Sequence, residues 1–290
     1  MLKALCIGEI LWDIFPDKKV WGGAPANFIF HTSQHGVKST AYTAVGNDEN
    51  GREIVREAEK CGINLVAKKV NFPTGVVNIS VDSKGVASYK FNQDCAWDHI
   101  PFTEELESLC KDADLITFGS LAQRSEISRK TIFEGLKLRK PSCKVLFDVN
   151  LRQSFYSKEI ILKSLKEADF LKLNEDEIVV FKELLGFDLP DLMERFGLEL
   201  IIFTLGAEGS QIISKNGTFN CPADKCNIVD TVGAGDSFTA TFIIHYLKGV
   251  SIPAAQKAAT KIAAYVCEHS GATVSIPNEL KKLSLEEERS

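Results

Sequence analysis

The sequence predicts an α/β fold, a three-layer α/β/α sandwich with a mainly parallel central sheet and a small β-hairpin lid. Two observations predict it. Short apolar runs alternate with longer amphipathic stretches along the 290 residues, and strands separated by helices of this length build parallel sheets covered on both faces. One stretch, residues 75–92, interrupts the alternation and has the pattern of two strands joined by a short polar turn.

Each predicted strand is a short apolar, β-branched run, and each predicted helix is a longer run with apolar residues on one side. The strands are predicted at Leu2–Gly8, Ser39–Val45, Leu115–Phe118, Lys144–Asp148, Phe170–Leu173 and Leu200–Thr204. The helices are predicted at Ala26–His35, Gly51–Cys61, Thr103–Lys111, Glu126–Leu138, Lys158–Glu167, Glu175–Leu185 and Ser237–Leu247. Right-handed crossovers would bring the carboxyl ends of the strands to one edge, where we expect the ligand crevice.

The interrupting stretch is predicted as a hairpin of Gly75–Val81 and Val86–Phe91, joined by Asp82–Gly85. A glycine in a short polar connection favours a tight turn. Such a hairpin could cover a site or could simply extend the sheet, and both interpretations stay open. A second hairpin is predicted at Gln211–Asn220, around Asn216-Gly217.

The chain shows no sign of division into several domains. It has no internal repeat and no linker rich in Pro, Gly or Ser. We therefore expect one domain over residues 1–290, with the lid formed mainly by about residues 75–98 and part of 10–22. The exposed edge of such a lid would allow two copies of the chain to pair as a homodimer.

Charge and hydropathy exclude several classes of protein. Lys and Arg number 34 against 39 Asp and Glu, a net charge of −5, which argues against a nucleic-acid or membrane-surface partner. No apolar run approaches the ~20 residues that a transmembrane helix needs. Met1–Phe15 begins like a signal peptide, but Glu9 and Asp13 interrupt its apolar stretch. We therefore predict a buried first strand and a cytoplasmic protein.

The cysteines and histidines form no recognisable disulfide or metal pattern. The eight cysteines are scattered and contain no C-x-x-C, so reduced, mostly buried thiols are expected. Cys221 and Cys226 have four residues between them, but no second close pair completes a zinc site. His31 and His35 could present two ligands on one helical face, yet without a third ligand we favour solvated or capping histidines.

The string Asp230–Asp236, DTVGAGD, carries the strongest chemical signal. Its two glycines let the backbone turn tightly, and the helix predicted directly after it would add free N–H groups and the positive end of its dipole. Such a turn holds a phosphate. Asp236 could be an ordinary first-turn carboxylate, but a carboxylate beside an anion hole is also suited to deprotonate a hydroxyl that attacks phosphorus.

Together with other strings in the same order, DTVGAGD resembles the signature of the ribokinase-like, or PfkB, carbohydrate kinases. The other matching strings are Gly22–Asn27 (GGAPAN), Asp148–Arg152 (DVNLR), Asn174–Glu177 (NEDE), Thr204–Gly209 (TLGAEG) and Ser270–Thr273 (SGAT). They cover nearly the whole chain. The resemblance implies a ribokinase-like fold and ATP-dependent phosphorylation of a sugar hydroxyl.

The resemblance also implies roles for the residues of the signature. Asp236 would be the general base, and Gly233, Ala234 and Gly235 would donate backbone hydrogen bonds to the transferring phosphoryl group. A protein that binds a sugar without catalysing a reaction would not require Asp236. The competing hypothesis of a silent sugar-sensing module is therefore less favoured than an enzyme.

ATP and magnesium are implied by other matching positions. Glu177, with Asn174, would act on Mg²⁺ through water, although a carboxylate at a helix start could simply complement the dipole. The nucleotide-binding residues that the resemblance implies are Asn174, Thr204, Gly206, Gly209 and Thr260. Neither a P-loop nor a G-x-G-x-x-G dinucleotide fingerprint occurs, which argues against other nucleotide-binding classes.

The family pattern places the sugar against the amino-terminal half of the chain and the hairpin lid. The implied substrate-binding residues are Asp13, Gly22, Gly23, Asn27, Phe91, Trp97 and Arg152. Carboxylate and amide groups would bind sugar hydroxyls, and the aromatic residues would exclude water from the reaction. Taken alone, Asp13 could be a turn residue and Arg152 a surface residue.

Two further properties follow from the resemblance. A monovalent cation such as K⁺ would bind beside the anion hole, at Asp230, Val232, Gly271 and Ser275. Fructose is the substrate that we favour, because Glu9–Asp13, Gly23–Asn27 and Asp148–Arg152 look like the fructokinase branch. Ribose, 2-keto-3-deoxygluconate and nucleosides stay open as substrates.

Overall fold

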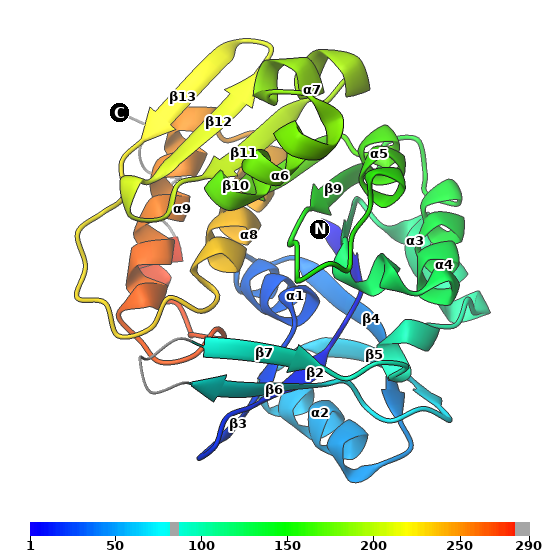
Figure 1. The fold of residues 1–290 in the computed structure, drawn as a ribbon. Coiled ribbons are helices and arrows are strands. Elements are labelled where there is room, and N and C mark those ends of the chain that lie inside the picture. The colour runs from blue at the N-terminus through cyan, green and yellow to red at the C-terminus, as the bar shows by residue number, and fades with distance from the viewer. Residues whose placement is uncertain (82–86, 282–290) are drawn as a thin grey trace.

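The computed structural model describes residues 1–81 and 87–281 and has the expected three-layer α/β/α architecture (Figure 1). The large sheet consists of β1 (Lys3–Ile7), β4 (Lys38–Gly46), β5 (Asn64–Val70), β8 (Leu115–Gly119), β9 (Lys144–Asp148), β10 (Phe170–Asn174), β11 (Leu200–Thr204), β12 (Ser210–Ser214) and β13 (Gly217–Cys221). Within the described residues its order is β13-β12-β11-β10-β9-β8-β1-β4-β5. Neighbouring strands pair in parallel, except that β12 is antiparallel to both β11 and β13.

The helices cover both faces of this sheet. One face packs against α1 (Ala24–Gln34), α2 (Glu49–Lys60), α8 (Ala234–Leu247) and α9 (Ile252–Cys267). The other face packs against α3 (Glu104–Asp112), α4 (Glu126–Lys137), α5 (Lys158–Glu167), α6 (Glu175–Leu185) and α7 (Leu189–Phe196). The strands are apolar on both sides because successive side chains point to opposite helical layers. In the part of the chain that the structure describes, every helix is too short or too polar to cross a bilayer.

Several helices begin where a side chain caps the free N–H groups of the first turn. The side chain of Asp48 accepts from Gly51 N–H at the start of α2, and Ser157 does the same for Ile160 N–H at the start of α5. Such caps are each worth about 1 kcal/mol. Gly186 and Gly197 end α6 and α7 in the left-handed conformation that favours glycine.

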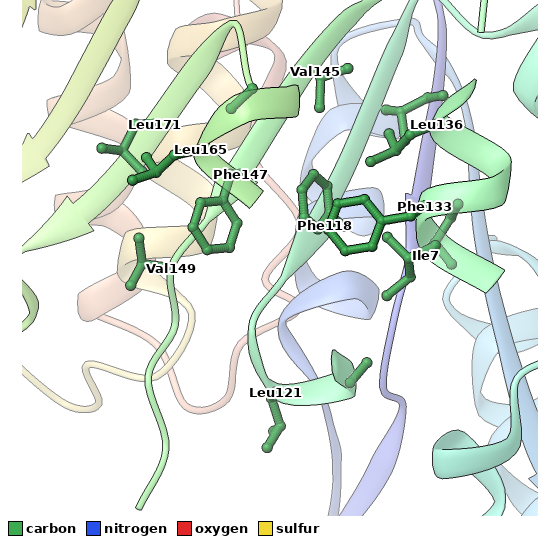
Figure 2. Close-up of a cluster of buried hydrophobic side chains, with 14 of the residues drawn as sticks. Ile7, Phe118, Leu121, Phe133, Leu136, Val145, Phe147, Val149, Leu165 and Leu171 are labelled. Atoms are coloured by element: carbon green, nitrogen blue, oxygen red, sulfur yellow. The ribbon is translucent and has the colours of Figure 1, made fainter. Parts of the chain in front are cut away.

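Aromatic stacking fixes the centre of the core on one face (Figure 2). The rings of Phe118 on β8 and Phe147 on β9 stack with centroids 5.3 Å apart, and Phe133 of α4 meets Phe118 edge-on at 6.1 Å. Phe118 and Phe147 are fully buried. Replacing either ring by alanine would cost about 3–5 kcal/mol of folding free energy.

A second, smaller sheet contains β2 (Leu11–Ile14), β3 (Lys19–Gly22), β6 (Val76–Val81) and β7 (Ala87–Phe91). Among the described residues its order is β3-β2-β6-β7. β6 and β7 are antiparallel, so the predicted hairpin is confirmed, and it forms a separate sheet rather than an extension of the large one. The predicted turn, Asp82–Gly85, lies outside the described residues together with Val86.

The predicted strands of the large sheet and the second hairpin are confirmed, but three helices begin two or three residues earlier than predicted. α2 begins at Glu49, directly after its N-cap Asp48. α1 begins at Ala24, because Pro25 is compatible with a first helical turn. α8 begins at Ala234, so Asp236 lies in its first turn rather than before it. The prediction omits β5, α7 and α9. The eight cysteines are free thiols, of which four are buried and four are partly exposed, so fewer are buried than expected.

Candidate active site

Polar side chains gather at the carboxyl edge of the parallel strands. Glu9 follows β1, and Asp148, Asn174 and Thr204 end β9, β10 and β11. The chain proceeds from β1 toward β5 on one side and from β8 toward β13 on the other, so its direction across the sheet changes between β1 and β8. Ligands of open α/β sheets bind at this kind of switch point. At the same edge, the short connection 8–10 leads from β1 into the small sheet.

The amino terminus of α8 is open toward this edge. Its N-cap residue, Gly233, has φ 79° and provides no side-chain cap. A Cβ on Gly233 would lie 2.7 Å from Cα of Ala272, so both the backbone conformation and the neighbouring loop require glycine. The N–H of Gly235 has no acceptor within the helix, and that of Ala234 makes a long hydrogen bond to the carbonyl oxygen of Thr231 at 3.3 Å. Both groups carry the positive end of the helix dipole. This end of α8 can therefore hold an anion.

Asp236 lies beside that open end, as predicted, and a residue of another helix holds its side chain. Nδ2 of Asn27, in α1, donates to Oδ2 of Asp236 at 2.8 Å. Burial and the nearby Asp148 carboxylate raise the pKa of Asp236, while Lys172, Asn27 and Arg152 oppose the rise. A carboxylate with a raised pKa is a better general base near neutral pH than an ordinary aspartate.

A buried ion pair supports the same edge. Nζ of Lys172, in β10, lies 3.1 Å from Oδ1 of Asp148, and both side chains are about nine-tenths buried. Burial alone would lower the pKa of Lys172, but the carboxylates of Asp148, Glu177 and Asp236 raise it above its ordinary value. The edge thus carries a fixed positive charge among several carboxylates.

Asn174 and Glu177 come together at the start of α6. Oδ1 of Asn174 accepts from Glu177 N–H and Oε2 of Glu177 accepts from Asn174 N–H, both at 2.9 Å, which is a capping box. Oε1 of Glu177 accepts from Leu151 N–H at 3.0 Å. Direct ligation of magnesium would compete with these hydrogen bonds, whereas contact through water would leave them intact. The oxygen atoms of Asn174 and Glu177 therefore fit the water-mediated contact with Mg²⁺ that the family resemblance implies.

Asp13 and the two glycines lie where the small sheet meets α1. Burial raises the pKa of Asp13 to about 6, against the lowering effect of Arg152. A Cβ on Gly22 would lie 2.4 Å from Oδ2 of Asp13, and one on Gly23, at φ 113°, would lie 2.4 Å from the carbonyl oxygen of Glu9. The glycine pair therefore makes room for the Asp13 carboxylate and for the close approach of two chain segments.

The loop after β9 meets the small sheet. Nε2 of Gln153 donates to the carbonyl oxygen of Tyr89 at 2.5 Å, and the ring of Phe91 packs edge-on against Phe155 at 5.8 Å. Asn150 and Gln153 both have positive φ, 40° and 48°, which is uncommon away from glycine and often occurs at functional sites. Arg152 is exposed in this loop, and its Nη1 donates to Leu151 O.

Trp97 does not lie over the site, contrary to the expectation. It is completely buried in the core, and the guanidinium of Arg124 lies 3.8 Å from its ring centroid. Gly75 allows this position, because a Cβ there would lie 2.2 Å from the indole nitrogen. A side chain without solvent exposure cannot contact a sugar in this conformation, so Trp97 is a core residue.

The predicted nucleotide-binding residues are divided between two regions. Thr204 ends β11, and Gly206 (φ 51°) and Gly209 (φ 106°) form the turn that follows. A Cβ on Gly209 would lie 2.1 Å from the carbonyl oxygen of Cys221, so this glycine is required by packing. Thr260 is buried on α9, and its hydroxyl donates to Gln256 O at 3.0 Å.

Three of the four residues predicted to bind a monovalent cation lie together. Asp230 accepts from Val232 N–H at 3.0 Å and from Gly271 N–H at 2.9 Å. The carboxylate thus joins the segment before α8 to the loop after α9. Ser275 lies further along that loop and is exposed.

His31 and His35 are buried, so the expectation of solvated side chains is wrong, but His35 is the C-cap residue of α1, as the alternative of a capping residue predicts. Nε2 of His31 hydrogen-bonds to the carbonyl oxygen of Ala272 at 2.8 Å, and Nε2 of His35 to the hydroxyl of Thr241 at 3.0 Å. Burial lowers the pKa of His31 to about 4, so it is neutral and donates one hydrogen bond. Its function in the fold is to hold the loop that packs against Gly233. Among the described residues no cluster of His, Cys, Asp and Glu could hold a metal ion.

Sequence reasoning missed three residues of this edge: Glu9, Thr117 and Lys172. In the sequence Glu9 interrupts the first apolar stretch and belongs to a family string, whereas Thr117 and Lys172 lie within predicted strands, and none of the three is predicted as a site residue. A charged residue in the middle of an otherwise apolar run, as in FLKLN, was the available signal, because an unpaired buried charge is too costly to occur without a partner.

An open helix end with a carboxylate beside it, at a switch point in a parallel sheet, can bind a phosphate and place a base next to it, which suits phosphoryl transfer. The chain belongs to the PfkB family of carbohydrate kinases, whose family model matches residues 15–279. It is therefore a phosphotransferase with the ribokinase-like fold.

Its relatives differ in the substrates that their names state. The chain is 30% identical to the sugar kinase PH1459 of Pyrococcus horikoshii over 98% of this chain and 95% of the relative. The crystal structure of PH1459, described as an uncharacterized sugar kinase, matches with a TM-score of 0.85 over 99% of this chain and 98% of that one. Fructokinase-2 of Oryza sativa subsp. japonica is 29% identical over 84% and 80% of the two chains. The nucleoside kinase of Methanocaldococcus jannaschii is 25% identical over 96% and 94%.

Proposed function

We propose that this chain transfers the γ-phosphoryl group of ATP to a hydroxyl group of a sugar, with fructose as the preferred acceptor. The observation that carries the proposal is the position of Asp236, held by Asn27 at 2.8 Å beside the open amino terminus of α8. PH1459 has been crystallised in complex with ATP, and that structure matches this chain with a TM-score of 0.81 at 27% identity, which supports ATP as the donor.

In the proposed step, a carboxylate oxygen of Asp236 accepts the proton of the sugar hydroxyl as the hydroxyl oxygen attacks the γ-phosphorus. The bond between this phosphorus and the β,γ-bridging oxygen breaks, and ADP leaves with that oxygen. The first-turn N–H groups of α8, including those of Ala234 and Gly235, donate hydrogen bonds to the γ-phosphoryl oxygens. Lys172 adds a buried positive charge that favours the anionic transition state.

Two cations belong to this proposal. Asn174 and Glu177 would hold Mg²⁺ through water molecules, and Mg²⁺ would supply neutralisation of phosphate charge when it is bound. Asp230, with the carbonyl oxygens near Val232 and Gly271, would bind a monovalent cation such as K⁺. Because Asp230 already joins the two loops that flank Gly233, a cation there would stabilise the open end of α8.

Fructose is proposed on the substrate-side residues and on similarity to rice Fructokinase-2. Asp13 and Asn27 present a carboxylate and an amide to a polyol, and the small sheet contacts the loop after β9 at Tyr89 and Gln153. A nucleoside is the second candidate, favoured by the similarity to the Methanocaldococcus jannaschii nucleoside kinase. A nucleoside is larger than fructose because it carries a base on its sugar ring.

A coupled ADP-release assay tests the proposal. Purified protein is given ATP, Mg²⁺ and K⁺ with fructose, ribose, 2-keto-3-deoxygluconate, glucose or adenosine. We expect turnover with fructose well above the others. Turnover with another acceptor would keep the reaction and replace the substrate. Folded protein that binds ATP but turns over none of them would favour the alternative of a catalytically silent sugar sensor.

A further inference from the structure

A small pocket lies at the switch point of the sheet, next to the proposed site. It is lined by Glu9 after β1, by Thr117 of β8, by Asp148 and Asn150 at the end of β9, and by the first turns of α1 around Ala24. The pocket has about 270 Å³ of free space, but only about 10 Å³ of it can hold the centre of a water molecule. It therefore admits one water-sized group.

Two side chains of this pocket have polar atoms without a partner. Glu9 is 2% exposed and Thr117 is 3% exposed. In the described part of the chain, neither Oε2 of Glu9 nor Oγ1 of Thr117 has a hydrogen-bond partner. Buried polar atoms in folded proteins are nearly always paired, and an orphan needs an explanation such as a ligand. Both orphans line the same pocket, so one ligand group could satisfy both.

The pocket adjoins the residues of the proposed reaction. The carbonyl oxygen of Glu9 lies 2.4 Å from where a Cβ of Gly23 would be, and α1 then leads from Ala24 to Asn27, which holds Asp236. Burial raises the pKa of Glu9 to about 7, and the carboxylates of Asp148 and Asp236 add to the rise. A carboxyl group with this pKa carries a proton for much of the time at neutral pH, so it can donate a hydrogen bond.

We propose that this pocket binds one hydroxyl group of the acceptor sugar, at a different carbon from the hydroxyl that Asp236 deprotonates, and that Glu9 and Thr117 are its hydrogen-bond partners. The inference rests on the proposed sugar kinase function and names the specificity-determining residues of that site. An uncharged hydroxyl fits the pocket in size. A phosphate or a nucleobase is too large for it, and the carboxyl groups of Glu9 and Asp148 would repel an anion.

Such a pocket distinguishes a sugar from its deoxy analogue. A sugar without the matching hydroxyl leaves Oε2 of Glu9 and Oγ1 of Thr117 buried and unpaired, and sites built to bind a hydroxyl reject analogues that lack it. We expect that one monodeoxy analogue has a kcat/KM about 10- to 100-fold below that of the parent sugar. The analogues modified at carbons that do not reach the pocket should lose less.

The test compares wild type with Thr117→Val, Glu9→Met and Glu9→Gln across D-fructose and its monodeoxy analogues. Thr117→Val keeps the shape of the side chain, so it carries the test even if Glu9→Met fails to fold. We expect Thr117→Val and Glu9→Met to lower kcat/KM for fructose about 10-fold, but to cause no loss on the one analogue whose missing hydroxyl belongs in the pocket. Glu9→Gln, which keeps a donor and an acceptor, should restore most of the activity. The KM for ATP should not change.

Equal losses on every analogue would overturn the inference, since a merely structural role affects all substrates alike. A sugar-bound crystal structure with a water molecule in the pocket and no sugar oxygen would also overturn it. If wild type phosphorylates no sugar at all, the proposed function itself fails. If wild type phosphorylates fructose but the variants lose kcat/KM equally on fructose and all its analogues, only the proposed role of the pocket is refuted.

Discussion

Two helix ends at the same edge of the sheet carry an acidic residue at the same helical position and use it differently. In α6 the third residue is Glu177, and its carboxylate accepts from the N–H groups of Asn174 and Leu151. In α8 the third residue is Asp236, and its carboxylate accepts from the side chain of Asn27, in a different helix. α6 has a side-chain N-cap and α8 has a glycine there.

Under the proposed function, the difference separates a helix end closed by its own side chains from one that is open to a reacting anion. The capping box satisfies N–H groups of α6 within its own first turn. Gly233 leaves the corresponding donors of α8 free for an anion, and the carboxylate that could have capped them is held to one side by Asn27. Under the proposed function, the chemistry belongs to α8, and α6 has a supporting role through water.

The largest effect is expected at Asp236. Asp236→Ala should lower kcat about 10²- to 10⁴-fold, the range for loss of a general base, while ATP still binds, since the backbone donors remain. The coupled ADP-release assay and calorimetric ATP titration measure the two effects. Asp191→Asn is the matched control, because Asp191 occupies the same third position in α7 and closes an exposed capping box. Activity of Asp236→Ala near that of this control would contradict the assignment.

The buried ion pair should matter next. Lys172→Met leaves Asp148 buried without its partner and should cost about 3–5 kcal/mol of folding free energy, measured by urea unfolding. Lys144→Met is the control: Lys144 pairs with Glu199 at 2.5 Å, but both side chains are about one-third exposed, so its loss should cost ~1 kcal/mol or less. Equal losses of folding free energy in the two variants would show that the buried pair of Lys172 and Asp148 stabilises the fold no more than an exposed ion pair does.

The open end of α8 should not tolerate a side chain. Gly233→Ala places an L-residue at φ 79° and a Cβ against Ala272, so we expect a loss beyond the ~1–2 kcal/mol of the left-handed conformation alone, together with reduced kcat. Gly186→Ala is matched, because Gly186 has φ 73° with no atom within 4 Å of the added Cβ. It should show the backbone cost without any change in kcat. Similar stabilities of the two variants would argue against close packing at Gly233.

The smallest effect is expected at the amino terminus of α6, which the side chain of Asn174 caps. Asn174→Ala removes the N-cap of α6 and should cost about 1 kcal/mol of stability, seen as a lower midpoint in urea. Under the proposed role in Mg²⁺ binding, the Mg²⁺ concentration needed for half-maximal activity should rise, while kcat at saturating Mg²⁺ falls far less than in Asp236→Ala. A loss of kcat as large as that of Asp236→Ala would show that both helix ends take part in the chemical step, which contradicts the proposed division of roles between α6 and α8.

Most strands of the sheet, both hairpins and the glycine turn before α8 can be predicted from the sequence, because these depend on local patterns. Alternating apolar runs define the strands, and DTVGAGD identifies the turn before α8 from adjacent residues. The partners of these residues come from distant segments and are not encoded locally. Asn27 and Asp236 are 209 residues apart in the chain, and the pairing of Lys172 with Asp148 depends on two strands being neighbours.

Trp97 and His31 show the same limit in a different way. Trp97 follows the hairpin in the sequence, which suggested an aromatic cover, but the room created by Gly75 allows its indole into the core. For His31, the spacing to His35 shows only that the two residues share one face of a helix. Its burial follows from the packing of α1 against α8 and the loop around Ala272, which no local pattern reveals.

The pH dependence of kcat tests the central claim most directly. Asp236 must be ionised to accept a proton, so kcat should fall as the pH drops through its pKa, which burial and Asp148 raise above the ordinary value of an aspartate. Asn27→Leu removes a hydrogen bond that lowers this pKa and should move the midpoint of the fall to higher pH. The account predicts a midpoint above the ordinary pKa of an aspartate in wild type and a higher one in Asn27→Leu. A kcat that stays constant down to pH ~4 in folded enzyme, or identical midpoints in the two proteins, would contradict the assignment of Asp236 as the general base.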